Sequence, residues 1–244
     1  MRPPAMSKRK ILCLHGIGTS GEVGKERLTR RLMLRPNKSR AQILKWQLGG
    51  LVTRLEAEQG FEFHFVDGPL NSPGHEEVLG LSPGPFYRWF SWTAPNPSAE
   101  DRESVKEAIR LLYTCIADEG PFEGILGFSQ GATLAYGFLQ HHANQNPLAP
   151  AHDLFRFAIL FSAPGLAKIR GVNDGAAKVG VPSLHICGRA DPWERESLSL
   201  VELCECGSAT VIRHSLGHTI PRDRATVSMI VDAVEKLQHN AGGF

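Results

Sequence analysis

The sequence predicts an α/β fold with a mostly parallel central sheet and helices on both faces. Short apolar runs bounded by glycine or polar residues alternate with longer stretches in which apolar residues recur at helical spacing. The 244 residues are 42% hydrophobic, which is enough for a sizeable core. No internal repeat and no long linker divides the chain. We therefore expect a single domain over residues 1–244.

The order of the elements follows from these patterns. Apolar or alternating runs predict strands at 10–14, 61–66, 122–127, 155–162, 182–187 and 209–213. Helical spacing predicts helices at 41–58, from the capping residue Ser98 to about 118, at 131–142, around 193–204 and at about 223–239. Residues 67–97 are dense in proline and glycine and predict a long loop, which we interpret as a lid or substrate loop.

The charge is nearly balanced, with 27 Lys and Arg against 25 Asp and Glu and a net charge of +2. A balanced charge of this kind gives no indication that the protein binds nucleic acid. The stretch 22–40 alone carries +5, from seven Lys or Arg and two Glu, and leaves −3 for the remainder. A solvated surface or disordered loop is the ordinary interpretation of this stretch.

The chain start, MRPPAMSKRK, has no apolar segment of the kind that secretory signals contain. No apolar run approaches the roughly 18 to 20 residues that span a bilayer. The five cysteines have no spacing typical of a disulfide framework. These features predict a cytoplasmic protein without a membrane span.

Polar residues follow three of the predicted strands at the point where each strand ends. Ser129 follows strand 122–127, Asp191 follows strand 182–187, and His218 follows strand 209–213. Because the carboxyl ends of parallel strands share one edge of a sheet, we expect the three side chains to meet there. The chain order Ser, Asp, His is that of the triad of the α/β-hydrolase fold.

Each residue type suits one role in nucleophilic catalysis. The hydroxyl of Ser129 needs a base to take its proton, and His218 can be that base near neutral pH. Asp191 is the candidate acid that orients the imidazole, with Glu194 in reserve. Simpler interpretations are a helix N-cap for Ser129, a cap of the following helix for Asp191 and a structural loop histidine for His218.

Two backbone N–H groups are candidates for an oxyanion hole. Gly127 and Gly131 leave room for a sharp turn that places the N–H of Gln130 at a helix start. The second N–H is expected from the loop after the first strand, from Ile17 in preference to Gly18 or Thr19.

The spacing of His214 and His218 resembles that of metal ligands, but it lies in a predicted strand and loop, and no HExxH motif is present. We therefore expect neither a metal site nor a cofactor. Five aromatic residues in the predicted loop are interpreted as the wall or lid of an apolar acyl pocket, with plain core as the alternative: Phe86, Tyr87, Trp89, Phe90 and Trp92.

The motifs ILCLHGIGTSG, FVDGP, GILGFSQGATLA, HICGRADPW and HSLGHTIPR together resemble the FSH-type serine hydrolases of fungi and other eukaryotes. The resemblance covers nearly the whole chain. It implies an α/β-hydrolase that cleaves carboxylic esters or thioesters with Ser129, Asp191 and His218 as its triad. Fungal members often release acyl chains from a polyketide synthase carrier domain, which implies a carrier-bound or small-molecule acyl substrate and a role in polyketide biosynthesis.

The chain departs from the family pattern at 22–40, which has the character of an insertion. It is interpreted as a lid extension, a docking patch for an acidic carrier protein or an error in the gene prediction. Two other functions stay open for the same scaffold. One is an acyltransferase or cyclising thioesterase, and the other is a catalytically silent binding module.

Overall fold

The computed structural model describes residues 9–20, 42–75, 79, 84–91, 97–148, 153–165 and 178–240. The stretch 22–40 and Trp92 lie outside the described residues, so the expectations for them stay predictions.

A parallel sheet of six strands forms the centre of the fold, in the order β3-β1-β6-β7-β8-β9. The strands are β1 (Arg9–Leu14), β3 (Phe61–Val66), β6 (Gly124–Phe128), β7 (Phe157–Phe161), β8 (Ser183–Gly188) and β9 (Ala209–His214). All six predicted strands are confirmed, and their ends shift by two residues at most.

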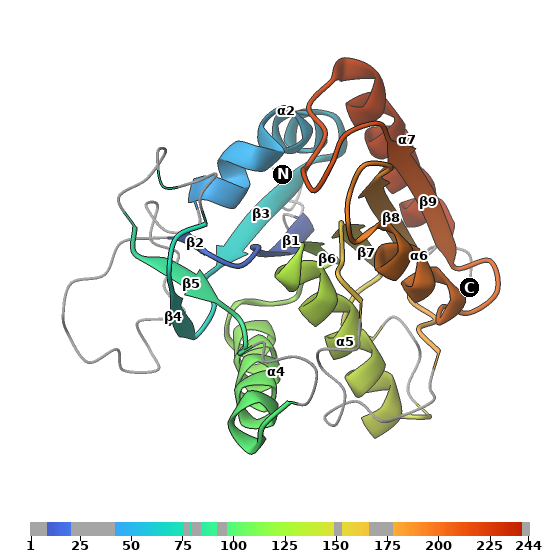
Figure 1. Cartoon of the computed structure of the whole chain (residues 1–244). Helices are drawn as coiled ribbons and strands as arrows, with labels where there is room; N and C mark the ends of the chain where they lie inside the picture. The colour runs from blue at the N-terminus through green and yellow to red at the C-terminus, as the bar shows by residue number, and fades with distance from the viewer. Residues whose placement is uncertain are drawn as a thin grey trace, which may run out of the picture.

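Helices cover both faces of this sheet, as predicted, and Figure 1 shows the three layers. Side chains of α2 (Gln42–Gln59) and α7 (Arg224–Asn240) pack on one face. Side chains of α4 (Ala99–Glu119) and α5 (Gln130–Gln145) pack on the other, together with Leu200 of α6 (Glu194–Glu202). The predicted α/β-hydrolase architecture is therefore the observed one.

Local sequence explains two details of the helices. Within α2, Gly49 has non-helical backbone angles (φ 26°, ψ −103°), so the helix is kinked at Gly49. At the start of α4, the Ser98 hydroxyl accepts a hydrogen bond from the N–H of Asp101, and the Asp101 carboxylate accepts one from the N–H of Ser98. The predicted cap at Ser98 is thus one half of a capping box.

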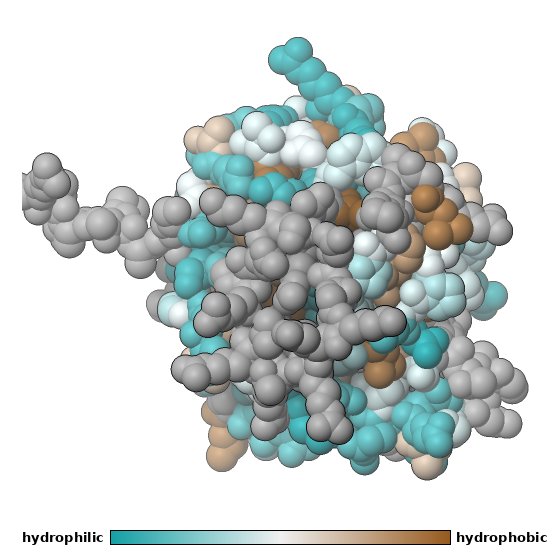
Figure 2. Space-filling view, turned by 90° about the vertical axis from the view of Figure 1, so that its left-hand side faces the viewer, coloured by the Kyte–Doolittle hydropathy of each residue, from teal (hydrophilic) through white to brown (hydrophobic). Residues whose placement is uncertain are grey.

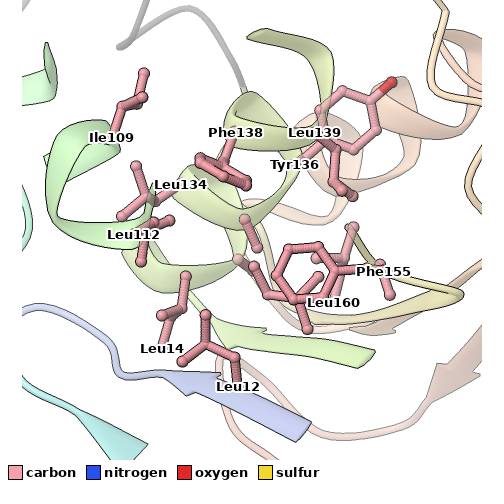
Figure 3. Packing of buried hydrophobic residues seen from close by; sticks show 14 of the residues in the cluster. Leu12, Leu14, Ile109, Leu112, Leu134, Tyr136, Phe138, Leu139, Phe155 and Leu160 are labelled. Atoms are coloured by element: carbon pink, nitrogen blue, oxygen red, sulfur yellow. The ribbon is translucent and has the colours of Figure 1, made fainter. Parts of the chain in front are cut away.

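Alternate residues of each central strand face opposite layers of the core. In β1, Leu12 and Leu14 join the cluster under α4 and α5, whereas Ile11 and Cys13 join the cluster under α2 and α7. Figure 3 shows the first cluster, in which the two leucines of β1 lie near apolar side chains of α4 and α5. Burial on both faces explains why Ile11–Leu14 of β1 is a continuous apolar run.

The prediction of one long loop over 67–97 was wrong in part. Two short strands lie within this range, β4 (Leu70–Ser72) and β5 (Phe86–Arg88). They pair antiparallel with each other, and β5 also pairs with β2 (Thr19–Ser20) beyond the end of β1. Strands of two or three residues have too few alternating positions to be recognised among prolines and glycines. The small sheet joins the loop after β1 to the aromatic segment (Figure 1).

Large hydrophobic side chains are exposed at separate places on the described surface. Figure 2, which views the side that carries the small sheet in Figure 1, shows hydrophobic residues interspersed among hydrophilic ones. The largest of the exposed side chains, Trp46, lies under the guanidinium of Arg222, whose Cζ is 3.8 Å from the ring centroid. Scattered exposure of this kind is ordinary for a protein surface. No helix within the described ranges is both long enough and apolar enough to cross a bilayer.

Candidate active site

The order of the strands reverses at β1, which has β3 on one side and β6 on the other. In open α/β sheets, ligands bind beyond the carboxyl ends of the strands at such a reversal. The loop that contains Ile17 follows β1, and Ser129 follows β6 directly. The fold therefore brings two of the predicted site segments to one place.

Ser129 occupies a strained turn between β6 and α5. Its φ of 53° and ψ of −119° are rare for a residue with a side chain, and such strain, of order 1–3 kcal/mol, clusters at functional sites. A Cβ added to Gly127 would meet the backbone of Ala132, and one added to Gly131 would meet the carbonyl oxygens of Leu14 and His15. The turn therefore requires glycine on both sides of the serine.

A continuous series of hydrogen bonds links Ser129, His218 and Asp191. The Nε2 atom of His218 lies 2.9 Å from the Oγ atom of Ser129. The Nδ1 atom of His218 lies 2.9 Å and 3.1 Å from the two carboxylate oxygens of Asp191. The carboxylate side chain is fully buried, whereas the imidazole is 29% exposed, so a substrate has access to the ring while the carboxylate is shielded from water. An imidazole held this way can take a proton from the hydroxyl and return it to a leaving group.

The structure separates the two candidate acids. Asp191 also accepts a hydrogen bond of 2.9 Å from the N–H of Trp193. Trp193 is itself the N-cap residue of α6, and α6 has no side-chain cap hydrogen bond, so the interpretation of Asp191 as a cap of this helix was wrong. Glu194 instead pairs with Arg213, with nitrogen–oxygen distances of 2.9 Å and 2.5 Å. The reserve acid therefore has another partner.

His214 supports the loop that carries His218. Its Nδ1 accepts a hydrogen bond from the N–H of Leu216, and its carbonyl oxygen accepts one from the N–H of Arg189. Leu216 in turn accepts a hydrogen bond from the N–H of Ala190. Burial lowers the pKa of His214, which favours its neutral form. These bonds tie the loop before Asp191 to the loop before His218. No cluster of three or more potential metal ligands occurs in the part of the chain that the structure describes.

The candidate oxyanion donors lie on the two loops at the strand reversal. Gln130 is the first residue of α5, so its N–H has no acceptor within the helix. None of the described residues accepts a hydrogen bond from the N–H of Ile17. The N–H of Gly18, by contrast, donates to the carbonyl of Tyr87 at 3.0 Å. Gly18 is therefore engaged elsewhere, and Ile17 remains our candidate.

His15 packs beneath this loop in a defined tautomer. The N–H of Gly68 donates to Nε2 of the ring at 2.9 Å, so the ring proton must be on Nδ1, which donates to the carbonyl of Gly16 at 2.6 Å. Burial lowers the pKa of His15 to about 4, in agreement with a neutral ring. His15 therefore supports the loop after β1 through a pair of hydrogen bonds.

The four aromatic residues of the loop that the structure describes are buried. Phe86 and Tyr87 are 8% and 6% exposed, and Trp89 and Phe90 are 0% exposed. Trp89 and Phe90 belong to the core cluster under α4 and α5, so they would support a pocket wall from behind rather than touch a substrate. Sequence reasoning missed the partner of this segment, which is the side chain of Gln130. The sequence contains one signal of such a partner, which is the long polar side chain of Gln130 in an otherwise small and apolar run. A buried amide needs hydrogen-bonding partners, so this side chain predicts a contact with another polar group.

The sequence is similar to a serine hydrolase family and to fungal proteins named as esterases or hydrolases. A family model described as Serine hydrolase (FSH1) matches residues 5–230. "Esterase FPY3" of Fusarium mangiferae is 31% identical over 93% of this chain and 96% of its own length. "Hydrolase phiM" of Talaromyces stipitatus is 29% identical over 95% of this chain and 88% of its own length.

Solved structures with the same fold include two esterases. The carboxylesterase of Bacillus cereus has a TM-score of 0.61 at 18% identity, over 97% of this chain and 92% of that one. Acyl-protein thioesterase 2 of Zea mays has a TM-score of 0.59 at 18% identity, over 97% and 96% of the two chains. At 18% identity, these similarities show a shared fold alone.

Proposed function

The chain belongs to the FSH1 serine hydrolase family, and from that premise we propose that it cleaves a carboxylic ester or thioester through an acyl-enzyme on Ser129. The observation that carries the proposal is the hydrogen-bonded series from Ser129 through His218 to Asp191. The strained turn at Ser129 supports the same role, because it presents the hydroxyl at the carboxyl end of the sheet.

Acylation begins when Oγ of Ser129 attacks the acyl carbonyl and Nε2 of His218 takes the hydroxyl proton. The carbonyl oxygen becomes an oxyanion, which the N–H groups of Gln130 and Ile17 stabilise by hydrogen bonds. Asp191 holds the proton of Nδ1 and stabilises the imidazolium. The bond to the leaving alcohol or thiol then breaks, and His218 returns its proton to the leaving oxygen or sulfur.

Deacylation repeats the steps with water as the nucleophile. His218 takes a proton from water, hydroxide adds to the acyl carbonyl, and the oxyanion returns to the same two N–H groups. Collapse of this intermediate releases a carboxylic acid, and the proton on His218 returns to Oγ of Ser129.

We further propose that the acyl group is an apolar chain, such as a polyketide, carried by a carrier protein or by a related small ester. The family resemblance supports a carrier-bound substrate, and the charge of +5 over residues 22–40 would suit an acidic carrier. Among similar proteins, one is named an acyl-protein thioesterase and others are named esterases.

The proposal is tested by labelling with a fluorophosphonate, which reacts with activated serines. We expect the wild-type chain to be labelled and Ser129→Ala to be unlabelled. Ser162→Ala is the matched control, because Ser162 also has a positive φ (48°), and we expect this variant to keep the label. An unlabelled wild type, or equal labelling of Ser129→Ala, would overturn the mechanism.

Product analysis with a carrier-bound acyl chain then identifies the acceptor. We expect the free acid. An ester of an added alcohol, or a lactone, as the sole product would indicate acyl transfer or cyclisation instead. A fold that only binds would give no turnover of p-nitrophenyl esters in the wild type.

A further inference from the structure

We propose that the segment Tyr87–Phe90 is a splint that fixes the two oxyanion donors relative to each other. Trp89 and the side chain of Gln130 are its positioning residues. The inference rests on the proposed function of Ser129, because it concerns the oxyanion of the same reaction. It also assigns the buried aromatic segment a role other than direct contact with the acyl chain.

One end of the splint is bound to the turn that carries the nucleophile. The side-chain oxygen of Gln130 accepts a hydrogen bond of 2.8 Å from the N–H of Trp89, and its side-chain nitrogen donates one of 2.9 Å to the carbonyl of Phe90. A backbone N–H can only donate and a carbonyl can only accept, so the amide orientation is unambiguous. Gln130 is fully buried, which leaves both bonds protected from water. The residue whose N–H is the first donor is therefore tied to the backbone of the splint.

The other end is bound on both sides of Ile17. The indole N–H of Trp89 donates to the carbonyl of His15 at 2.8 Å, and the carbonyl of Tyr87 accepts the N–H of Gly18 at 3.0 Å. The ring of His15 also lies against Trp89, with 5.0 Å between the centroids. His15, two residues before Ile17, and Gly18, the residue after it, are thus both hydrogen-bonded to the splint.

The direction of the Ile17 N–H follows from these contacts. Nδ1 of His15 holds the carbonyl of Gly16, and this carbonyl belongs to the same planar peptide group as the N–H of Ile17. The next peptide group, between Ile17 and Gly18, is held by Tyr87. Both peptide planes that flank Ile17 are consequently fixed before any substrate binds.

An oxyanion hole needs this kind of support because its donors come from separate loops. Each N–H must lie about 2.7–3.1 Å from the position of the oxyanion, and catalytic groups tolerate displacements of only about 0.5 Å. Adjacent strands β1 and β6 set the approximate spacing, but each loop can still rotate about its own strand end. A buried segment bonded to both loops removes that freedom.

The first experiment compares Trp89→Phe with Phe138→Leu. Trp89→Phe keeps an aromatic ring and removes the indole N–H, so the bond to His15 is lost. Phe138→Leu removes ring volume from the same core cluster without touching either loop, and it serves as the control for loss of packing. For a short-chain p-nitrophenyl ester, we expect Trp89→Phe to lower kcat by roughly tenfold to a hundredfold at nearly constant KM. That is less than the 10²–10³-fold caused by removing a donor outright. We expect Phe138→Leu to lower the melting temperature at least as much and to change kcat by less than about threefold.

A second measurement separates positioning from general weakening of the fold. A trifluoromethyl ketone adds reversibly to an active-site serine and places an oxyanion at the donors. We expect Trp89→Phe to weaken binding of the ketone by the same factor by which it lowers kcat. Binding of the carboxylic acid product should change by no more than about twofold. Gln130→Glu keeps an acceptor for Trp89 and, in the neutral form that burial favours, an O–H donor for Phe90, whereas Gln130→Met loses both bonds. We therefore expect the loss to be larger in Gln130→Met.

The outcomes distinguish this inference from the proposed function. If the wild type shows no activity that depends on Ser129, the proposed function fails. If that activity is present but Trp89→Phe and Phe138→Leu lose kcat equally, the splint is wrong while the proposed function stands. Equal weakening of the ketone and of the product acid would also overturn the splint.

Discussion

The Nε2 atom of His218 lies 2.9 Å from the Oγ atom of Ser129, although 89 positions separate the two residues in the chain. No local pattern brings them together. Ser129 follows β6 and His218 follows β9, and these strands are separated by two others in the sheet. The contact arises because the loop after β9 is held over the sheet by its bonds to the loop after β8.

The role of Asp191 is tested by Asp191→Asn. The N–H of Trp193 donates to one oxygen of residue 191, so the amide of asparagine would place its oxygen there and its nitrogen toward His218. His218 would then have to accept at Nδ1 and carry its proton on Nε2, where it cannot take the proton of Ser129. We expect kcat for an ester substrate to fall by about 10³–10⁴ while the melting temperature changes little.

Glu194→Gln is the matched control for this loss of charge, since Glu194 is the neighbouring carboxylate and pairs with Arg213 at the surface. We expect less than a threefold change in kcat from this variant. A comparable loss in both variants would mean that net charge, and not the contact with His218, is responsible.

The glycines beside Ser129 are tested by thermodynamic stability. In Gly131→Ala, the new methyl group would meet the carbonyl oxygens of Leu14 and His15, so we expect the free energy of unfolding to fall by about 1–3 kcal/mol. Gly50 of α2 has no atom within 4 Å of an added Cβ, so Gly50→Ala should raise the same quantity by about 0.5–1 kcal/mol. Urea denaturation of both variants checks the pair. Equal effects would show that the turn does not require glycine at residue 131.

Much of the fold is predictable because its strands are buried on both faces. Run 10–14 is apolar apart from Lys10, run 182–187 is apolar apart from Ser183 and His185, and each ends abruptly at a polar residue or glycine. These signals locate the strand ends, and in a parallel sheet the strand ends locate the site. Ser129, Asp191 and His218 are therefore predictable as site residues from the sequence alone.

The side-chain partners of buried polar groups are harder to predict. The sequence predicts a role for the backbone N–H of Gln130 in the oxyanion hole. It does not predict that the side chain of Gln130 binds the backbone of residues 89 and 90, about forty positions earlier. The strands β4 and β5 were also missed by the sequence prediction. They form because separate segments of the chain pair with each other, and their own sequences show no alternation of apolar and polar residues that would predict a strand. The sequence leaves the aromatic segment open as a pocket wall or as core, and the burial of Trp89 and Phe90 follows only from their packing with side chains of α4 and α5.

A carrier-docking role for residues 22–40 is tested by neutralising the stretch without shortening it. Replacing its seven basic residues with glutamine should raise KM for a carrier-bound acyl chain by about tenfold or more, and should leave KM for a small thioester within about twofold. The seven are Lys25, Arg27, Arg30, Arg31, Arg35, Lys38 and Arg40. Because exposed charges are screened by salt, the difference should also shrink at high ionic strength. Equal changes for the two substrates would contradict a docking role.

The last prediction concerns stability in acid and follows from His15 and His185. Both rings are buried, and burial lowers the pKa of each from 6.5 to about 4. Between these values the unfolded chain binds a proton on each histidine and the folded chain does not, so the free energy of unfolding falls as the pH falls. Each histidine should contribute a loss of about 3 kcal/mol over this interval.

Urea denaturation at pH 7 and at pH 4.5 measures the effect, with His185→Gln as the variant. A glutamine side chain cannot bind a proton, so the variant should lose about 2–3 kcal/mol less than the wild type between the two pH values, whatever its stability at pH 7. His239→Gln is the control, because His239 is exposed at the end of α7, and its loss should match that of the wild type. If His185→Gln lost as much stability as the wild type, protonation of the unfolded chain at residue 185 would not be the cause.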